Sequence, residues 1–75
     1  MGIKEGILAK LKAQWKTEVE RQFKENPDKV RNADVKKNAT EIMANPAIKG
    51  ASKPVGIKVE DIERILTEIR NEVCK

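Results

Sequence analysis

The side chains that suggest a binding chemistry are six basic residues in the middle third of the chain. They are Lys29, Arg31, Lys36, Lys37, Lys49 and Lys53. Ammonium and guanidinium groups neutralise phosphates and release counterions, so a site built from them would bind nucleic acid in a strongly salt-dependent way. Such a site requires that the fold bring these residues together on one face. Lysines scattered over a small charged domain would instead only keep it soluble.

The distribution of charge favours the same segment. The chain carries a net charge of +4 at pH 7, to which residues 1–26 contribute +2, residues 27–53 contribute +3 and residues 54–75 contribute −1. The basic surplus therefore lies in the first two thirds of the sequence. No aromatic residue lies among the six basic residues, which disfavours the binding of single strands by base stacking.

Catalytic chemistry has few candidate residues. The chain has no histidine, and its one cysteine, Cys74, has no partner in the sequence; histidine is the commonest general base and metal ligand. No glycine-rich phosphate-binding loop and no set of ligands at metal-binding spacing occurs. The acidic cluster at 60–63 is interpreted as part of a surface ladder instead. Arg64 is four residues from both Glu60 and Glu68, and such pairs contribute about 0.2–0.5 kcal/mol each. We expect no enzyme activity, cofactor, metal or small-molecule substrate.

Trp15 and Phe23 are the only aromatic residues and the candidate residues of a protein interface. They belong to an apolar stripe that covers an arc of about 160° on a helix predicted over residues 3–24. Its members are Ile7, Leu8, Leu11, Trp15, Val19 and Phe23. The stripe is predicted to pack in the core or to contact a partner helix or a second copy. Acidic residues beside its second half favour either arrangement over a membrane surface.

The last helix, predicted over residues 58–74, has the clearest periodicity in the chain. Its stripe consists of Ile62, Ile65, Leu66, Ile69 and Val73, and an apolar stripe of this kind must be buried against another element. Lys58 occupies the N-cap position, and Ile57 and Ile62 are spaced to form a hydrophobic staple.

The middle of the chain is predicted to form a shorter helix over residues 34–44. A helical turn near 27–32 precedes it, with Asn26 as the cap and Pro27 at the first position. The segment 45–57, which contains two prolines and two glycines, is predicted to be an irregular loop with at most one helical turn. We therefore expect one all-α domain over residues 1–75. Its fold would be a small three-helix bundle, with the first and last helices packed lengthwise.

Residues 56–66 read Gly-Ile-Lys-Val-Glu-Asp-Ile-Glu-Arg-Ile-Leu. The segment resembles the turn and second helix of helix-turn-helix DNA-binding domains, and the resemblance implies that this helix reads DNA. However, the preceding helix would have to contain Pro54, which costs about 3 kcal/mol in a helix interior. The acidic residues of the segment would also repel phosphates. We therefore interpret it as a core helix.

A single cysteine favours a reducing, cytoplasmic setting. No apolar run approaches the roughly 18 residues of a membrane span, and the charged opening lacks the apolar block of a secretory signal.

The first functional hypothesis is a small non-enzymatic protein that binds nucleic acid phosphates through the basic middle segment. The alternative is a protein-interaction or self-assembly module that uses the apolar stripe of the first helix.

Overall fold

The structure is a computed structural model that describes residues 2–74, and its regular elements are all helical. In chain order they are α1 (Ile3–Glu25), α2 (Pro27–Arg31), α3 (Val35–Ala44), α4 (Pro46–Ser52), the 3₁₀ helix η1 (Lys53–Val55) and α5 (Val59–Val73). The predicted all-α fold is therefore confirmed. The long helices at the two ends and the shorter one between them correspond to the three predicted helices.

Two Asn-Pro pairs set the helix boundaries. Asn26 Oδ1 accepts a hydrogen bond from the Lys29 N–H at 3.3 Å, and Asn45 Oδ1 accepts one from the Ala47 N–H at 2.9 Å. In each pair the proline occupies the first helical position, where its missing N–H costs nothing and its fixed φ suits the helix. The predicted cap at Asn26 is confirmed, and Asn45 caps a further helix.

The prediction of an irregular loop over residues 45–57 is wrong, because α4 and η1 occupy most of it. Gly50 and Pro54 suggested a loop, but Gly50 is tolerated within α4 and Pro54 lies beyond its end, in η1. Ser52 is buried, and its carbonyl accepts a hydrogen bond from the Ile57 N–H at 3.1 Å. Gly56 then turns the chain with φ +75°, a conformation that glycine adopts without steric cost.

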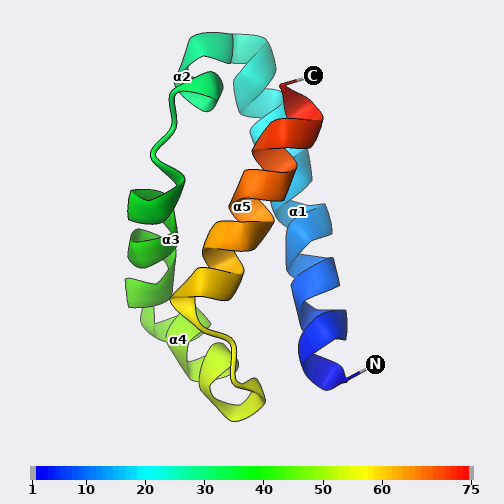
Figure 1. Cartoon of the computed structure of the whole chain (residues 1–75), viewed down its shortest axis with the longest axis vertical. Coiled ribbons are helices and arrows are strands. Elements are labelled where there is room, and N and C mark those ends of the chain that lie inside the picture. Colours follow the sequence, from blue (N-terminus) through cyan, green and yellow to red (C-terminus); the bar gives the residue numbers. More distant parts are fainter. Residues whose placement is uncertain (1, 75) are drawn as a thin grey trace.

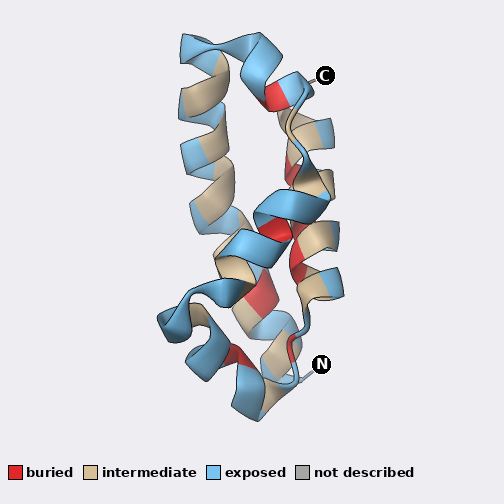
Figure 2. Ribbon diagram, turned by 90° about the vertical axis from the view of Figure 1, so that its left-hand side faces the viewer, coloured by how far each residue is buried: buried red, intermediate tan, exposed pale blue. Residues whose placement is uncertain are grey.

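Helix α5 is a core helix, as predicted. Asp61 accepts a hydrogen bond from the Lys58 N–H at 3.0 Å and so caps the helix start. Ile57 and Ile62, the predicted staple, are both buried in the central cluster. Ile65 and Ile69 complete the buried stripe. Figure 2 colours the buried positions of the molecule red. The helix therefore serves as the centre of the domain, because it buries more residues than any other element described.

Helices α1 and α3 pack on different sides of α5 (Figure 1). Helix α1 runs parallel to α5, and α3 runs in the opposite direction. Leu8 of α1 and Ala39 of α3 are buried against the isoleucines of α5. The molecule measures 35 × 25 × 17 Å. Helices α1 and α3 diverge from each other on the two sides of α5. The divergence leaves an open groove between them, which is described below.

Candidate functional site

Ion pairs join α1 to α5 along their length. Lys12 Nζ lies 2.7 Å from Glu72 Oε2 and 3.2 Å from Glu68 Oε2, and Lys16 Nζ lies 2.9 Å from Glu72 Oε1. Lys4 Nζ lies 3.1 Å from Asp61 Oδ2 at the other end of the same interface. These four contacts show that the charges of the two helices neutralise one another across the interface.

The predicted ladder of Glu60, Arg64 and Glu68 along α5 does not form. Arg64 Nη2 instead lies 3.9 Å from Asp61 Oδ1, and Glu68 faces Lys12 of α1. The sequence spacing allowed both arrangements. The parallel packing of α1 decides between them, because it places a lysine within reach of Glu68.

Glu72 and Lys12, which pair with each other at this interface, have shifted pKa values. Hydrogen bonds from Lys12 and Lys16 lower the pKa of Glu72 to about 2. The same contact, with a second hydrogen bond to Glu68, raises the pKa of Lys12 above its usual value of 10.5. Both shifts favour the charged forms, so the ion pairs persist at neutral pH.

The excess positive charge lies entirely in the segment that connects α1 to α5. This connecting segment, residues 27–58, carries seven basic and three acidic side chains, a difference equal to the net charge of the whole chain. The remaining residues carry nine of each sign. The residues outside the connecting segment, which include α1 and α5, are therefore neutral as a set, and the connecting segment is the source of the positive field.

All six predicted phosphate-binding residues lie on exposed positions of the connecting segment, but not in one patch. Lys29 and Arg31 belong to α2 at one end of the molecule, and Lys49 and Lys53 belong to α4 and η1 at the other end (Figure 1). Lys36 and Lys37 lie between the two ends, in the first turn of α3. The cations are thus spread along the long axis of the molecule.

Within residues 2–74, five of these six residues make no ion pair. The exception is Arg31, whose Nη1 lies 3.7 Å from Asp28 Oδ1 and whose guanidinium carbon lies 5.4 Å from the centroid of the Phe23 ring. The five lysines therefore keep their charge available to an anionic partner. Lys58 belongs to the same surplus, and sequence reasoning missed it because its capping position suggested a structural role.

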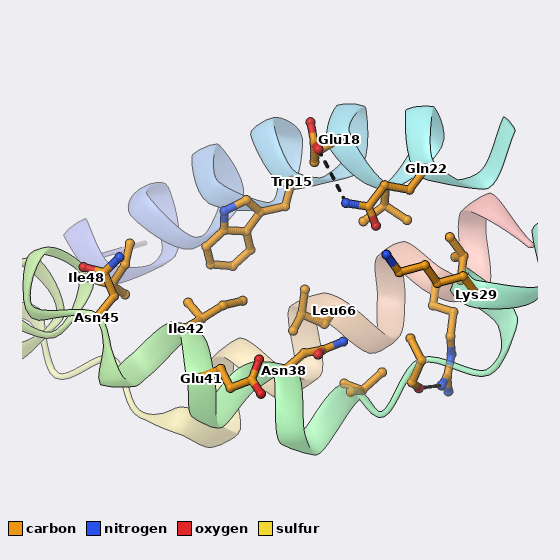
Figure 3. Close-up of a pocket in the computed structure, with 15 residues that line it drawn as sticks. Trp15, Glu18, Gln22, Lys29, Asn38, Glu41, Ile42, Asn45, Ile48 and Leu66 are labelled. Atoms are coloured by element: carbon orange, nitrogen blue, oxygen red, sulfur yellow. Dashed lines mark hydrogen bonds between the residues drawn. The ribbon is translucent and has the colours of Figure 1, made fainter. Parts of the chain in front are cut away.

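An open groove of about 630 Å³ lies between α1 and α3, and α5 forms its floor. Trp15 and Val19 of α1 line one wall, and Ile42 of α3 lines the other. Leu66 of α5 lies at the base between them (Figure 3). The groove could not be predicted from the sequence, because the helical stripes indicate which residues face inward but not how far α1 and α3 diverge.

Trp15 and Phe23, the predicted interface pair, are separated in the structure. Trp15 is partly buried and points into the groove (Figure 3). Phe23, also partly buried, lies instead under the guanidinium of Arg31 near α2. Only Trp15 can therefore contact a partner that occupies the groove.

Residues 2–74 contain no group of three or more carboxylate, thiol or imidazole side chains placed to hold a metal ion. Over the same residues, no helix combines the length and the apolarity that crossing a bilayer requires. No protein-family model, curated protein or solved structure matches the chain.

Proposed function

We propose that this protein is a non-enzymatic binding protein that contacts the phosphate backbone of duplex nucleic acid through the lysines of its connecting segment. One observation carries the proposal: the ion pairs between α1 and α5 leave the connecting segment with the whole net positive charge. Unpaired lysines gain most from phosphate contact, because no internal partner has to be displaced.

The spread of the cations favours contact along a backbone over capture of a single phosphate. The longest dimension of the molecule, 35 Å, is close to one turn of a duplex, about 34–36 Å. Lysines at α2, α3 and α4 can therefore reach phosphates spread over about one turn of the duplex. Contacts of this kind position a protein without reading sequence. We place this activity in the cytoplasm, where the single free cysteine is compatible with a reducing environment.

The experiment that tests the proposal is fluorescence anisotropy with a labelled duplex of arbitrary sequence. With about four phosphate contacts, the affinity falls about a hundredfold between 50 and 200 mM salt. The double variant Lys49→Gln/Lys53→Gln reduces both the affinity and the salt dependence. The matched control Lys10→Gln/Lys24→Gln removes the same charge from exposed positions of α1, and it retains most of the affinity. Equal losses in the two variants, or no binding at low salt, would contradict the proposal.

The position of Trp15 supports a second candidate function, that of a protein-interaction module. A large aromatic side chain in an open groove is a typical anchor for a partner. Acrylamide quenching of the fluorescence measures how far Trp15, the only tryptophan, is open to solvent in the monomer. Efficient quenching is expected from the partly exposed ring. A fully shielded tryptophan in a monomer would rule out this candidate.

A further inference from the structure

We propose that the groove between α1 and α3 binds an amphipathic α-helix of another protein. The bound helix has basic residues beside its apolar stripe and directs its C-terminus toward α2. This inference rests on the second candidate function above and adds the chemistry and orientation of the partner. It does not depend on phosphate binding, although Lys29 belongs both to the connecting segment and to the groove lining.

The surface area of the molecule indicates that a helix-sized element can still be added. Its accessible surface is 5370 Å², whereas a compact monomer of this mass exposes about 4,650 Å². The radius of gyration is 12.4 Å, compared with about 11.3 Å for a compact chain of this length. The surplus of roughly 700 Å² is close to the ~800 Å² that each partner buries in a standard interface.

The shape and lining of the groove fit one additional helix. Trp15 and Val19 face Ile42 across the groove, and Leu66 supplies an apolar base (Figure 3). Leu66 belongs to the stripe of α5 but stays only partly buried, because α1 and α3 cover the stripe from its two sides. A wall formed by α3, ten residues long, matches a partner helix of about three turns. A helix in this place would complete a four-helix arrangement around the stripe of α5.

Charges around the groove specify the partner. Glu41 lines the α3 wall and makes no ion pair among the described residues, whereas Glu18 on the α1 wall already pairs with Arg21. Basic side chains beside the apolar stripe of a bound helix therefore find a free carboxylate on the α3 side and a shared one on the α1 side. Lys29 and Arg70 line the end near α2, and the Arg70 guanidinium is held there by a 3.2 Å hydrogen bond from Nη1 to the carbonyl oxygen of Ala33. Cations stabilise the negative C-terminal end of a helix. The bound helix therefore directs its C-terminus toward α2.

A second copy of this chain is a poorer occupant than a foreign helix. The stripes of α1 and α5 are already packed against each other, with Leu8, Ile62 and Ile69 buried. Among residues 2–74, Ile3 is the only large hydrophobic residue that is exposed. No described helix of this chain offers a free apolar stripe of three turns to insert into a neighbour's groove.

The test uses a synthetic helical peptide of about 14 residues. Its leucines are spaced i, i+3, i+4 and i+7, lysines flank them, and alanines fill the other positions. A second peptide replaces the lysines with glutamates, and a third scrambles the order. Binding is read from the emission of Trp15, which shifts to shorter wavelength when the peptide covers the ring. We expect the lysine peptide to bind at least tenfold more tightly than the glutamate peptide. Non-specific attraction to a protein of net charge +4 would give the opposite order.

A charge swap locates the binding site. Glu41→Lys changes an exposed position of the groove wall. We expect it to lower the affinity for the lysine peptide about fivefold or more and to raise the affinity for the glutamate peptide. The control Glu60→Lys makes the same change on an exposed position outside the groove lining and has little effect. A lysine peptide with a free C-terminal carboxylate is expected to bind more tightly than the same peptide with a C-terminal amide, because the carboxylate would lie near Lys29. Circular dichroism verifies that both variants fold.

Three results would overturn the inference: a glutamate peptide that binds as well as the lysine peptide, equal effects of the two charge swaps, or no shift of Trp15 with any peptide. If acrylamide still reaches Trp15 in those cases, the broader protein-interaction function survives and only the proposed partner is wrong. A concentration-dependent shift of Trp15 in the protein alone, with dimers in sedimentation, would assign the groove to a second copy instead.

Discussion

Glu72 is the residue that most clearly connects α1 with α5. Its carboxylate lies 2.7 Å from Lys12 Nζ and 2.9 Å from Lys16 Nζ. The sequence did not predict these contacts, because they join positions 56 residues or more apart and require the two helices to run parallel at one register. At the residue scale the sequence predicted only local features, the helix caps at Asn26 and Lys58. Each cap forms its hydrogen bond with a residue three positions away in the sequence.

The lowered pKa of Glu72 makes this contribution to stability depend on pH. The usual pKa is 4.5 and the folded-state pKa is about 2, so the stabilisation is fully present above pH 4.5 and is lost as the pH falls toward 2. We expect Glu72→Gln to lower the melting temperature at pH 7 by a few degrees or less, since the pairs are exposed. The difference in melting temperature between the variant and the parent protein should shrink as the pH falls from 4.5 to 2.

Thermal denaturation followed by circular dichroism across that pH range measures the effect. Glu60→Gln serves as the control, because Glu60 lies on the same helix and makes no ion pair among the residues described. A difference for Glu72→Gln that stays constant down to pH 2 would show that the carboxylate does not stabilise α1 against α5.

At the scale of elements, the periodicity of apolar residues predicted α1, α3 and α5 within one or two residues of their ends. It failed for α4, because a helix of seven residues with Pro46 at its first position, Gly50 inside it and Pro54 just beyond its end has little intrinsic helix propensity. Two terminal features hold it instead: the Asn45 cap at its start and the buried Ser52 at its end. Capping and tertiary burial override propensity in short helices, and only the first can be read from a sequence.

The glycines provide a matched test of the element boundaries. Gly6 lies inside α1 and Gly56 adopts φ +75°, and an added methyl group would meet no atom within 4 Å at either position. Gly6→Ala is therefore expected to stabilise the protein by about 0.5–1 kcal/mol, because alanine restricts the unfolded chain and favours the helix. Gly56→Ala is expected to destabilise it by about 1–2 kcal/mol, because the left-handed conformation is strained for alanine.

Urea denaturation of the two variants and the parent protein gives both values in one series. Steric contacts cannot explain a difference between the variants, since both sites are open. Changes of the same sign would contradict the assigned conformation of α1 around Gly6 or of the turn at Gly56.

At the scale of the whole molecule, the division of charge is the feature with functional consequences. The basic surplus of the middle third was visible in the sequence, whereas the pairing of α1 lysines with α5 carboxylates became visible only with the interhelical contacts of Lys4, Lys12 and Lys16. The sequence left open whether the six basic residues converge, and they do not form one patch, because α2 and α4 lie at opposite ends of the molecule. The groove was equally inaccessible to sequence reasoning, because it depends on the angle between α1 and α3.

The measurement that most directly tests this account is a ¹H–¹⁵N correlation spectrum of the protein, recorded while a duplex oligonucleotide is added at low salt and again after salt is raised. Phosphate binding by the connecting segment predicts that the amide signals of residues 27–58 shift most. It also predicts that they return toward their free positions at high salt, with the Trp15 indole signal little changed. Shifts concentrated on Trp15 and on the α1 and α5 residues that line the groove, or no shifts at low salt, would contradict the claim that this segment is a nucleic-acid-binding surface.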